Sequence, residues 1–241
     1  MLDHMTFKQA IEQFPQQLLY EPEMVNKEQL RPYERFIVIG MGGSLHAHDL
    51  LKIWNPVLPS IGHRDYGLPL LEEHELKERL IILSSYSGNT EETLAALAEA
   101  EAKGAKIVVI AGGGKLQEIA ESKNHPFMLI PKVEQPRYVV LYNLKALVVA
   151  LEAAGLVNQA QASAAIHQAG DFLKQKVTAW TATMPTKDNP AKKLAEELAG
   201  KSIVIYAGPL LAPVAYKWKI NFNENAKNVA WWNQYPEFNH N

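Results

Sequence analysis

The amino-acid sequence predicts an α/β protein: a three-layer sandwich around a parallel, flavodoxin-like sheet, followed by a second unit of the same kind that is incomplete. Two observations predict this fold. Short all-apolar runs, each typical of a buried strand, alternate with helical patterns along the first part of the chain. After a break rich in proline and polar residues the alternation resumes, but it supplies only two more strands before the sequence ends.

The first unit is predicted from five strand-like and three helix-like segments between residues 36 and 130. An amphipathic helical pattern over residues 5–19, interrupted by Pro15, precedes them. The strands are predicted at 36–39, 80–83, 106–110 and 127–130, with an edge strand at 60–66. The helices between them are predicted at 44–54, 90–103 and 115–122. Because the strands are almost wholly apolar, we expect helices on both faces of the sheet.

The end of the first unit is marked by a change of composition. An Ala/Leu/Val-rich helix over 138–154 stops at Gly155, and glycine is a common helix terminator. A polar Gln/Ala-rich helix over 158–182 follows as a connector. We therefore predict an N-terminal domain at 1–155, and a connector with a partial second domain at 156–241. The second domain is predicted to run helix, strand, helix, strand at 190–200, 202–206, 211–224 and 228–232.

The composition excludes several classes of function. The chain has 241 residues, of which 47% are hydrophobic and 21% are charged, as in ordinary soluble globular proteins. A net charge of −2 gives no reason to expect nucleic acid or an anionic membrane as a partner. The absence of cysteine excludes disulfide scaffolds and thiolate metal sites. With no secretory leader pattern and no apolar run of about 20 residues, we expect a cytoplasmic protein.

The first candidate binding motif is the glycine-rich turn Gly40-Met41-Gly42-Gly43-Ser44, directly after the first predicted strand. Backbone amides in such a turn, together with the following helix N-terminus, favour an anion. Two alternatives stay open. Dinucleotide-binding folds use similar turns, although Leu45 stands where their third glycine would be, with Asp65 as the ribose-binding acid. The glycines are also compatible with nothing more than a tight strand-to-helix turn.

The second candidate motif is the run S-S-Y-S-G-N-T-E-E-T at 84–93, which opens a helix after another buried strand. Its hydroxyls Ser85, Ser87 and Thr90, with the helix N-terminal amides, could cradle a phosphate without a lysine. The alternative is helix capping by Asn89 or Thr90. Capping needs one hydroxyl, however, and open α/β sheets bind ligands at this end of their strands. We therefore favour phosphate binding.

These two loops resemble the signature of sugar isomerase (SIS) domains, S-x-S-G-x-T-E-E-T, which holds a sugar phosphate. The resemblance implies four hydroxyl ligands for the phosphate: Ser44, Ser85, Ser87 and Thr90. It also implies that Gly42 and Gly43 lie against the sugar.

Three further motifs resemble the two-domain bifunctional phosphoglucose/phosphomannose isomerases, and the resemblance covers nearly the whole chain. They are Asn-Pro-Ala-Lys-Lys-Leu-Ala at 189–195, Asn-Glu-Asn-Ala-Lys at 223–227 and Pro-Glu-Phe-Asn-His-Asn at 236–241. In that family the glutamate of the second motif is the base, and the histidine of the third opens the sugar ring across the interface of a homodimer. These roles map to Glu224 and His240. Without the resemblance, Glu224 would read as a helix-end carboxylate and His240 as a tail residue.

A further candidate is Arg137, in Pro136-Arg137-Tyr138 after the fourth predicted long strand. An arginine here could stabilise an enediolate oxyanion, although the residues alone equally allow a solvated surface arginine. The chemistry implied is interconversion of glucose 6-phosphate and/or mannose 6-phosphate with fructose 6-phosphate through a cis-enediol. It needs a carboxylate base, stabilisation of the enediolate and an anchored phosphate, and neither a metal nor an organic cofactor.

Alternatives to this function remain. The family has a further C-terminal segment that supplies a lysine and a hydroxyl residue to the site, and neither has a counterpart here. A non-catalytic sugar-phosphate-binding protein or fragment is therefore the alternative, and other SIS enzymes are a weaker one. The pair His46 and His48 has poor spacing for a metal site on a helix. The tryptophans are better explained as core or interface than as a nucleic-acid platform.

Overall fold

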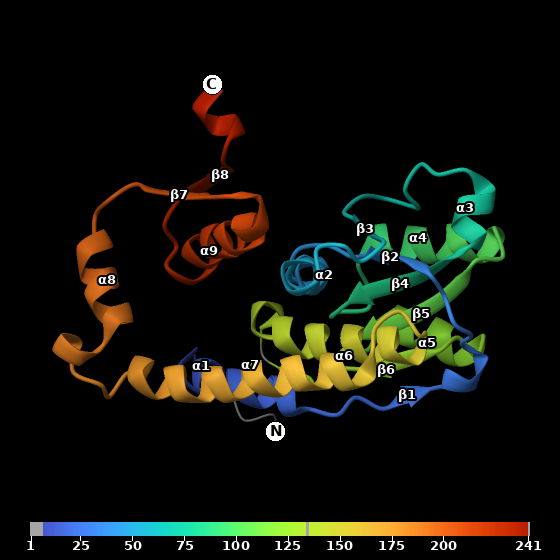
Figure 1. Ribbon diagram of the computed structural model, residues 1–241, viewed down its shortest axis with the longest axis horizontal. Coiled ribbons are helices and arrows are strands. Elements are labelled where there is room, and N and C mark those ends of the chain that lie inside the picture. The colour runs from blue at the N-terminus through green and yellow to red at the C-terminus, as the bar shows by residue number, and fades with distance from the viewer. Residues whose placement is uncertain (1–6, 134, 241) are drawn as a thin grey trace.

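The computed structural model describes residues 7–133 and 135–240, so residues 5 and 6 of the predicted first helix and Asn241 lie outside the described residues. Its main feature is a six-stranded sheet in the order β1-β6-β5-β4-β2-β3 (Figure 1). The strands are β1 Met24–Val25, β2 Arg35–Ile39, β3 Ser60–His63, β4 Arg79–Ser85, β5 Lys106–Ala111 and β6 Phe127–Leu129. All neighbours are parallel except β1, which is antiparallel to β6. The predicted parallel sheet, with an edge strand at β3, is confirmed.

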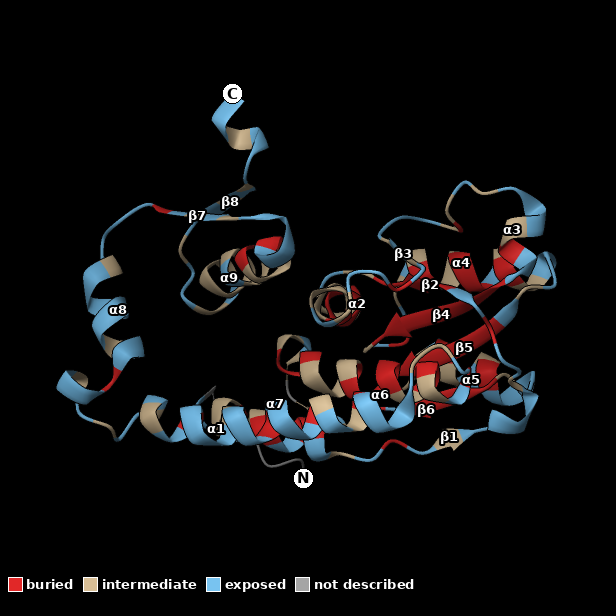
Figure 2. Cartoon of the chain, viewed as in Figure 1, coloured by how far each residue is buried: buried red, intermediate tan, exposed pale blue. Residues whose placement is uncertain are grey.

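Helices cover both faces of this sheet, as its apolar strands require. Helices α2 (Gly43–Trp54) and α6 (Val140–Ala153) cover one face. The other face is covered by α3 Glu73–Lys77, α4 Glu91–Ala102 and α5 Gly114–Ser122. Within β2, Phe36 and Val38 join the first core and Ile37 and Ile39 join the second, because successive side chains point to opposite faces. Buried residues accordingly fill β2, β4 and β5 (Figure 2).

Two long helices pack beneath α6. Helix α1 runs over Phe7–Leu19 and α7 over Gln159–Trp180, and they contact each other along the molecule. The predicted interruption at Pro15 was wrong, because α1 continues through it. A proline removes one helical hydrogen bond. Here Gln17 and Leu18 are buried just after it, and the Gln17 side-chain amide donates to the Tyr138 carbonyl oxygen at 2.6 Å, which fixes this end of the helix.

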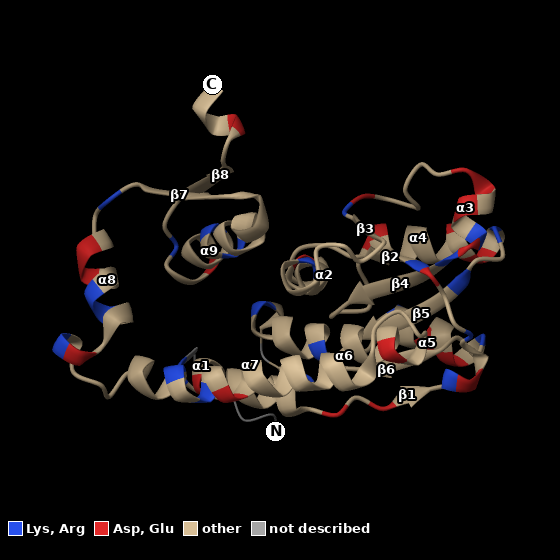
Figure 3. Cartoon of the chain, viewed as in Figure 1, with Lys and Arg blue, Asp and Glu red and all other residues tan. Residues whose placement is uncertain are grey.

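The second unit is smaller and more open. It contains η3 Thr186–Asp188, α8 Pro190–Leu198, β7 Ile203–Ala207, η4 Pro209–Leu211, α9 Ala212–Asn225, β8 Ala230–Gln234 and η5 Glu237–His240. Strands β7 and β8 form a parallel two-stranded sheet on which α9 packs. Helix α8 buries no residue and carries two lysines followed by two glutamates (Figure 3). The predicted order of elements is confirmed, whereas the domain boundary at 155/156 stays a prediction.

The two units meet where α9 lies against α2. The rings of His46 on α2 and Tyr216 on α9 have centroids 6.5 Å apart. In the part of the chain that the structure describes, no helix combines the length and the apolar character needed to cross a membrane.

Candidate active site

Two loops form the floor of the candidate site, and both follow the carboxyl ends of neighbouring parallel strands. The register pairs Ile39 at the end of β2 with Leu83 of β4, so the loops that follow emerge at the same edge of the sheet. The backbone amide of Tyr86 donates to Ser44 Oγ at 3.3 Å and ties the two loops together. Since this bond uses Ser44 Oγ as an acceptor, its own hydroxyl proton stays available to an anion.

Glycine is required by close backbone approach at two points of these loops. A Cβ on Gly40 would lie 2.6 Å from the Ser84 carbonyl oxygen. Gly88 has φ +67°, and a Cβ there would lie 1.7 Å from the carbonyl oxygen of Gly113, in the loop after β5. The glycines therefore do form tight turns, as the alternative to anion binding proposed. That role leaves the backbone exposed to a ligand and does not exclude binding.

The hydroxyls of the second loop form a cluster. Ser85 Oγ lies 2.7 Å from Thr90 Oγ1 and 3.4 Å from Ser87 Oγ. Thr90 occupies the N-cap position of α4, but its side chain makes no capping hydrogen bond. Helix capping by the Thr90 hydroxyl therefore does not explain why three hydroxyls gather here. Asn89 is occupied elsewhere, because its side-chain oxygen accepts from the Lys115 amide at 3.1 Å.

A cavity of about 490 Å³ opens above the loops, between the two units. Its lining residues are Met41, Gly42, Gly43, Ser44, His46, Tyr86, Ser87, Thr90, Pro136, Arg137, Lys217, Ile220 and Glu224. Seven of the predicted site residues are therefore brought together around one space. Ser85 is not in the lining: it is buried, and its hydroxyl contacts the hydroxyls of Thr90 and Ser87, which do line the cavity.

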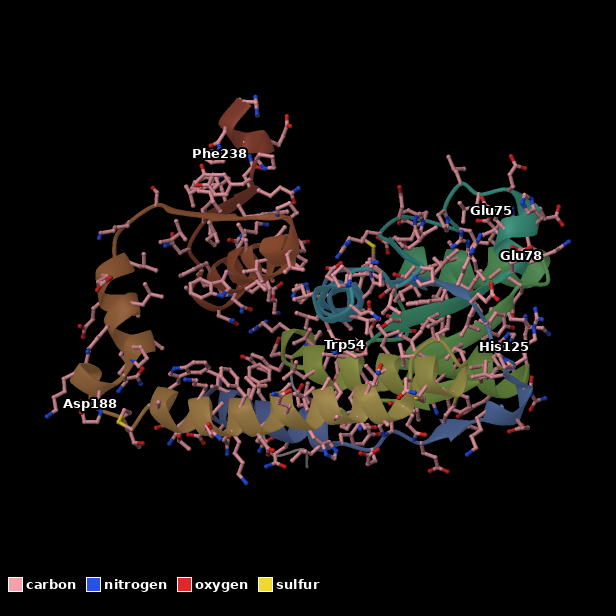
Figure 4. The ribbon with its side chains drawn as sticks, in the orientation of Figure 1. Trp54, Glu75, Glu78, His125, Asp188 and Phe238 are labelled. Carbon is pink, nitrogen blue, oxygen red and sulfur yellow. The ribbon has the colours of Figure 1, made fainter. Side chains whose placement is uncertain are left out.

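His240 is the second predicted residue that does not line the cavity. It is exposed at the end of η5, and it is absent from the cavity lining. The element is held by Phe238, labelled in Figure 4, whose ring stacks on Tyr206 of β7 with centroids 4.1 Å apart. Asp65, the acid of the dinucleotide alternative, is exposed after β3 and also lies outside the cavity lining.

Arg137 and Glu224 come from different units and form an ion pair at the cavity wall. Arg137, in η2 (Pro136–Tyr138), has Nη1 4.0 Å from Oε2 of Glu224 near the end of α9. The guanidinium also donates to Gln135 Oε1 at 3.1 Å and lies 5.2 Å from the Tyr138 ring centroid. This arrangement puts a carboxylate and a cation side by side, so the arginine is not a freely solvated surface residue.

Sequence reasoning missed Lys217. It lines the cavity seven residues before Glu224 on α9, which is two helical turns and hence the same face. Burial lowers the pKa of Lys217, and the charge of Arg137 lowers it further, while Glu224 opposes the shift. The spacing to Glu224 was a usable signal, but only with the knowledge that this face of α9 meets the loops.

The chemistry of the lining favours a ligand that carries a phosphate group and is otherwise uncharged. Two cationic side chains and four hydroxyl-bearing residues surround the space, with one carboxylate among them. Among the described residues, no group of three or more histidine, aspartate and glutamate side chains is placed to hold a metal ion.

Two family models match this chain. The SIS domain model matches residues 62–157, and the model of the bacterial phospho-glucose isomerase C-terminal SIS domain matches residues 187–241. The first match runs from the end of β3 through β4, β5 and β6 to the end of α6, and the second covers the second unit.

Individual relatives agree with the family models. The chain is 35% identical to a bifunctional phosphoglucose/phosphomannose isomerase of Caldicellulosiruptor bescii over 86% of this chain and 61% of that protein. A second enzyme so named, from Thermoplasma volcanium, is 32% identical over 95% and 70%. A D-glucosamine-6-phosphate 4-epimerase of Sulfolobus acidocaldarius is 33% identical over 86% and 62%. The chain thus spans about six-tenths of the length of the first and third of these proteins.

A solved structure shares the fold at low identity. The C-terminal domain of glucosamine-fructose-6-phosphate aminotransferase from Francisella tularensis aligns with a TM-score of 0.64 and 15% identity, over 99% of this chain and 72% of that one. This likeness concerns the arrangement of strands and helices only.

Proposed function

This chain belongs to the bifunctional phosphoglucose/phosphomannose isomerase family, and from that premise we propose that it interconverts glucose 6-phosphate and/or mannose 6-phosphate with fructose 6-phosphate. One observation carries the proposal. A single cavity joins the hydroxyl loops and Arg137 of the first unit to Glu224 of the second. That is the combination an aldose–ketose isomerase needs, because the phosphate must be anchored at a distance from the base.

The proposed mechanism assigns a step to each group. Ser44, Ser87 and Thr90, with the N-terminal amides of α4, bind the phosphate. Glu224 takes the proton from C2 of the open-chain aldose and returns it to C1, which converts the cis-enediol to the ketose. Arg137 stabilises the oxygen that carries negative charge in the intermediate, and Lys217 adds a second positive charge.

Ring opening needs another acid–base group, for which we propose His240 of the partner subunit in a homodimer. The exposure of this histidine in a single chain supports that proposal, since it is free to enter a neighbouring site. Exposed large apolar side chains on β7 and β8 support an interface here: Val204, Tyr206 and Trp231 are 49%, 43% and 54% exposed. We also propose that the protein acts in the cytoplasm.

The decisive experiment measures fructose 6-phosphate formed from each aldose phosphate by the chain and by its Glu224→Gln variant. We expect turnover by the unmodified chain and a loss of about 10³- to 10⁴-fold in kcat in the variant, because the amide cannot accept the proton. Glu196→Gln, an exposed glutamate on α8, serves as the matched control and should leave kcat unchanged.

Other outcomes separate the alternatives. No turnover, with a thermal midpoint that fructose 6-phosphate still raises, would indicate a sugar-phosphate-binding protein. Because one relative is named an epimerase, glucosamine 6-phosphate belongs in the same assay. Equal activity of the Glu224→Gln variant and the parent would rule out the assigned base.

A further inference from the structure

His46 lies in the wall of the candidate active site and has no part in the mechanism above. It is on α2, two residues after Ser44, and both residues line the cavity. Its side chain is only 2% exposed, so protein encloses nearly all of the ring. A polar ring in such a place needs partners, and its partners define which atom is left for a ligand.

One ring nitrogen is already committed. His46 Nδ1 lies 3.3 Å from Oδ2 of Asp49, three residues further along the helix, and Arg64 Nη2 donates to the same oxygen. An ionised carboxylate can only accept hydrogen bonds. The proton of a neutral His46 is therefore placed on Nδ1, and Nε2 carries the lone pair.

Asp49 is well suited to hold this tautomer. Burial alone would raise the pKa of Asp49, but the hydrogen bond from His46 and the charge of Arg64 hold that pKa well below its usual range. Asp49 consequently stays ionised throughout the neutral range and fixes the direction of the hydrogen bond.

The second unit fixes the ring from another side. Tyr216 of α9 lies with its ring centroid 6.5 Å from that of His46, and Tyr216 in turn lies 5.5 Å from the Trp232 ring. A side chain whose orientation is set by a carboxylate on one side and by aromatic rings on another is preorganised in the way that ligand-binding groups require.

We propose that His46 is a substrate-binding residue whose Nε2 accepts a hydrogen bond from a hydroxyl of the sugar phosphate, with Asp49 and Arg64 as positioning residues. The inference rests on the proposed function and extends it. A lone pair on Nε2 repels phosphate oxygens and attracts hydroxyl protons, so His46 contacts the sugar and the loops hold the phosphate.

Two substitutions at His46 test which nitrogen matters. Glutamine can place its amide near the Nε2 position, whereas asparagine reaches only about as far as Nδ1. We expect kcat/KM for the sugar phosphates to fall about 10- to 100-fold in His46→Asn and less than about 10-fold in His46→Gln. Inorganic phosphate, which has no sugar hydroxyl, should keep its inhibition constant within about twofold in both.

The inhibition constant also reports on folding of the helix. Ser44 is on α2 with His46, so disorder of α2 would weaken the binding of inorganic phosphate as well as the binding of the sugar phosphates. His48→Gln is the matched control. His48 is buried with Nδ1 3.9 Å from Asp49, but its Nε2 lies 2.9 Å from Ser60 Oγ, and the residue does not line the cavity. Its kcat/KM should stay within about threefold of the parent.

A measurement on the unmodified chain covers the case in which the variants do not fold. In nitrogen-15 histidine spectra, the Nε2 signal of His46 should move when fructose 6-phosphate is added and stay in place with inorganic phosphate. An unmoved signal, while fructose 6-phosphate raises the thermal midpoint, would overturn the inference and leave the proposed function standing. If fructose 6-phosphate neither binds nor turns over, both fail together.

Discussion

Strand β7 of the small sheet is as apolar as β4 and β5 of the large sheet, but its surroundings differ. All seven residues of β4 are buried, and β5 is buried from its second residue onward. Strand β7 reads Ile-Val-Ile-Tyr-Ala, as apolar as either, yet only Ile203 is buried, and exposed and half-buried positions alternate after it. Val108 of β5 has no exposed surface, whereas Val204 of β7 is 49% exposed. An apolar run therefore predicts that a strand forms, but the number of covered faces depends on which helices pack there.

The largest expected effect comes from comparing a glycine-to-alanine substitution in each unit, at glycines whose φ angles are positive. Gly88→Ala should lower the free energy of unfolding by more than about 3 kcal/mol, since its Cβ would collide with the Gly113 carbonyl oxygen. Gly200, at the start of the second unit's sheet, has φ +73° and open space around it, so Gly200→Ala should cost only about 1 kcal/mol. Urea unfolding followed by circular dichroism measures both. Similar losses would show that the loop contact at Gly88 is looser than the structure has it.

The next effect compares the same substitution in the two sheets. Val108→Ala removes buried methyl groups and should cost about 2 kcal/mol, through lost burial and the cavity left behind. Val204→Ala should cost less than about 0.5 kcal/mol, because the side chain is half exposed. The difference between the two urea midpoints is the measurement. A cost at Val204 as large as at Val108 would mean that the open face of β7 is covered in solution.

The smallest effect concerns Lys217, where the second unit contributes charge to the cavity. Because its pKa is lowered, Lys217 loses its positive charge earlier than an ordinary lysine as pH rises, and anion binding weakens with it. Lys217→Arg keeps the charge. Between pH 8 and pH 10, the affinity for inorganic phosphate should fall about threefold more in the parent than in this variant. If the phosphate affinities of the parent and of Lys217→Arg fall equally with pH, Lys217 does not act on the bound anion.

Most of the fold could be predicted because each long strand carries its own signal. The runs around Val108 and Val204 need no knowledge of the rest of the chain. Strand β1, two residues long, was missed because such a short segment has no periodicity, and it forms only where β6 offers an edge. The continuation of α1 through Pro15 was missed because it depends on tertiary contacts of Gln17 and Leu18.

The site was predictable to the extent that its residues sit in motifs. The hydroxyl loop and Glu224 stand in recognisable runs. Lys217 stands in no such run, and the pairing of His46 with His48 did not predict the role assigned to it; both residues line the cavity where α9 packs against α2. Their contribution is a property of the packing between units, which local sequence does not encode.

Arg137 and Lys217 have a consequence for ligand design, because they border two spaces. Beside the polar cavity lies a second one of about 500 Å³, whose lining includes Phe14 and Phe222 together with these two cations. These two residues, which both have long, rotatable side chains, thus lie on the partition between the two spaces. An inhibitor with a phosphorylated polyol head and a hydrophobic tail could displace this partition and occupy both chambers. Its tail would meet side chains that no step of the proposed reaction uses.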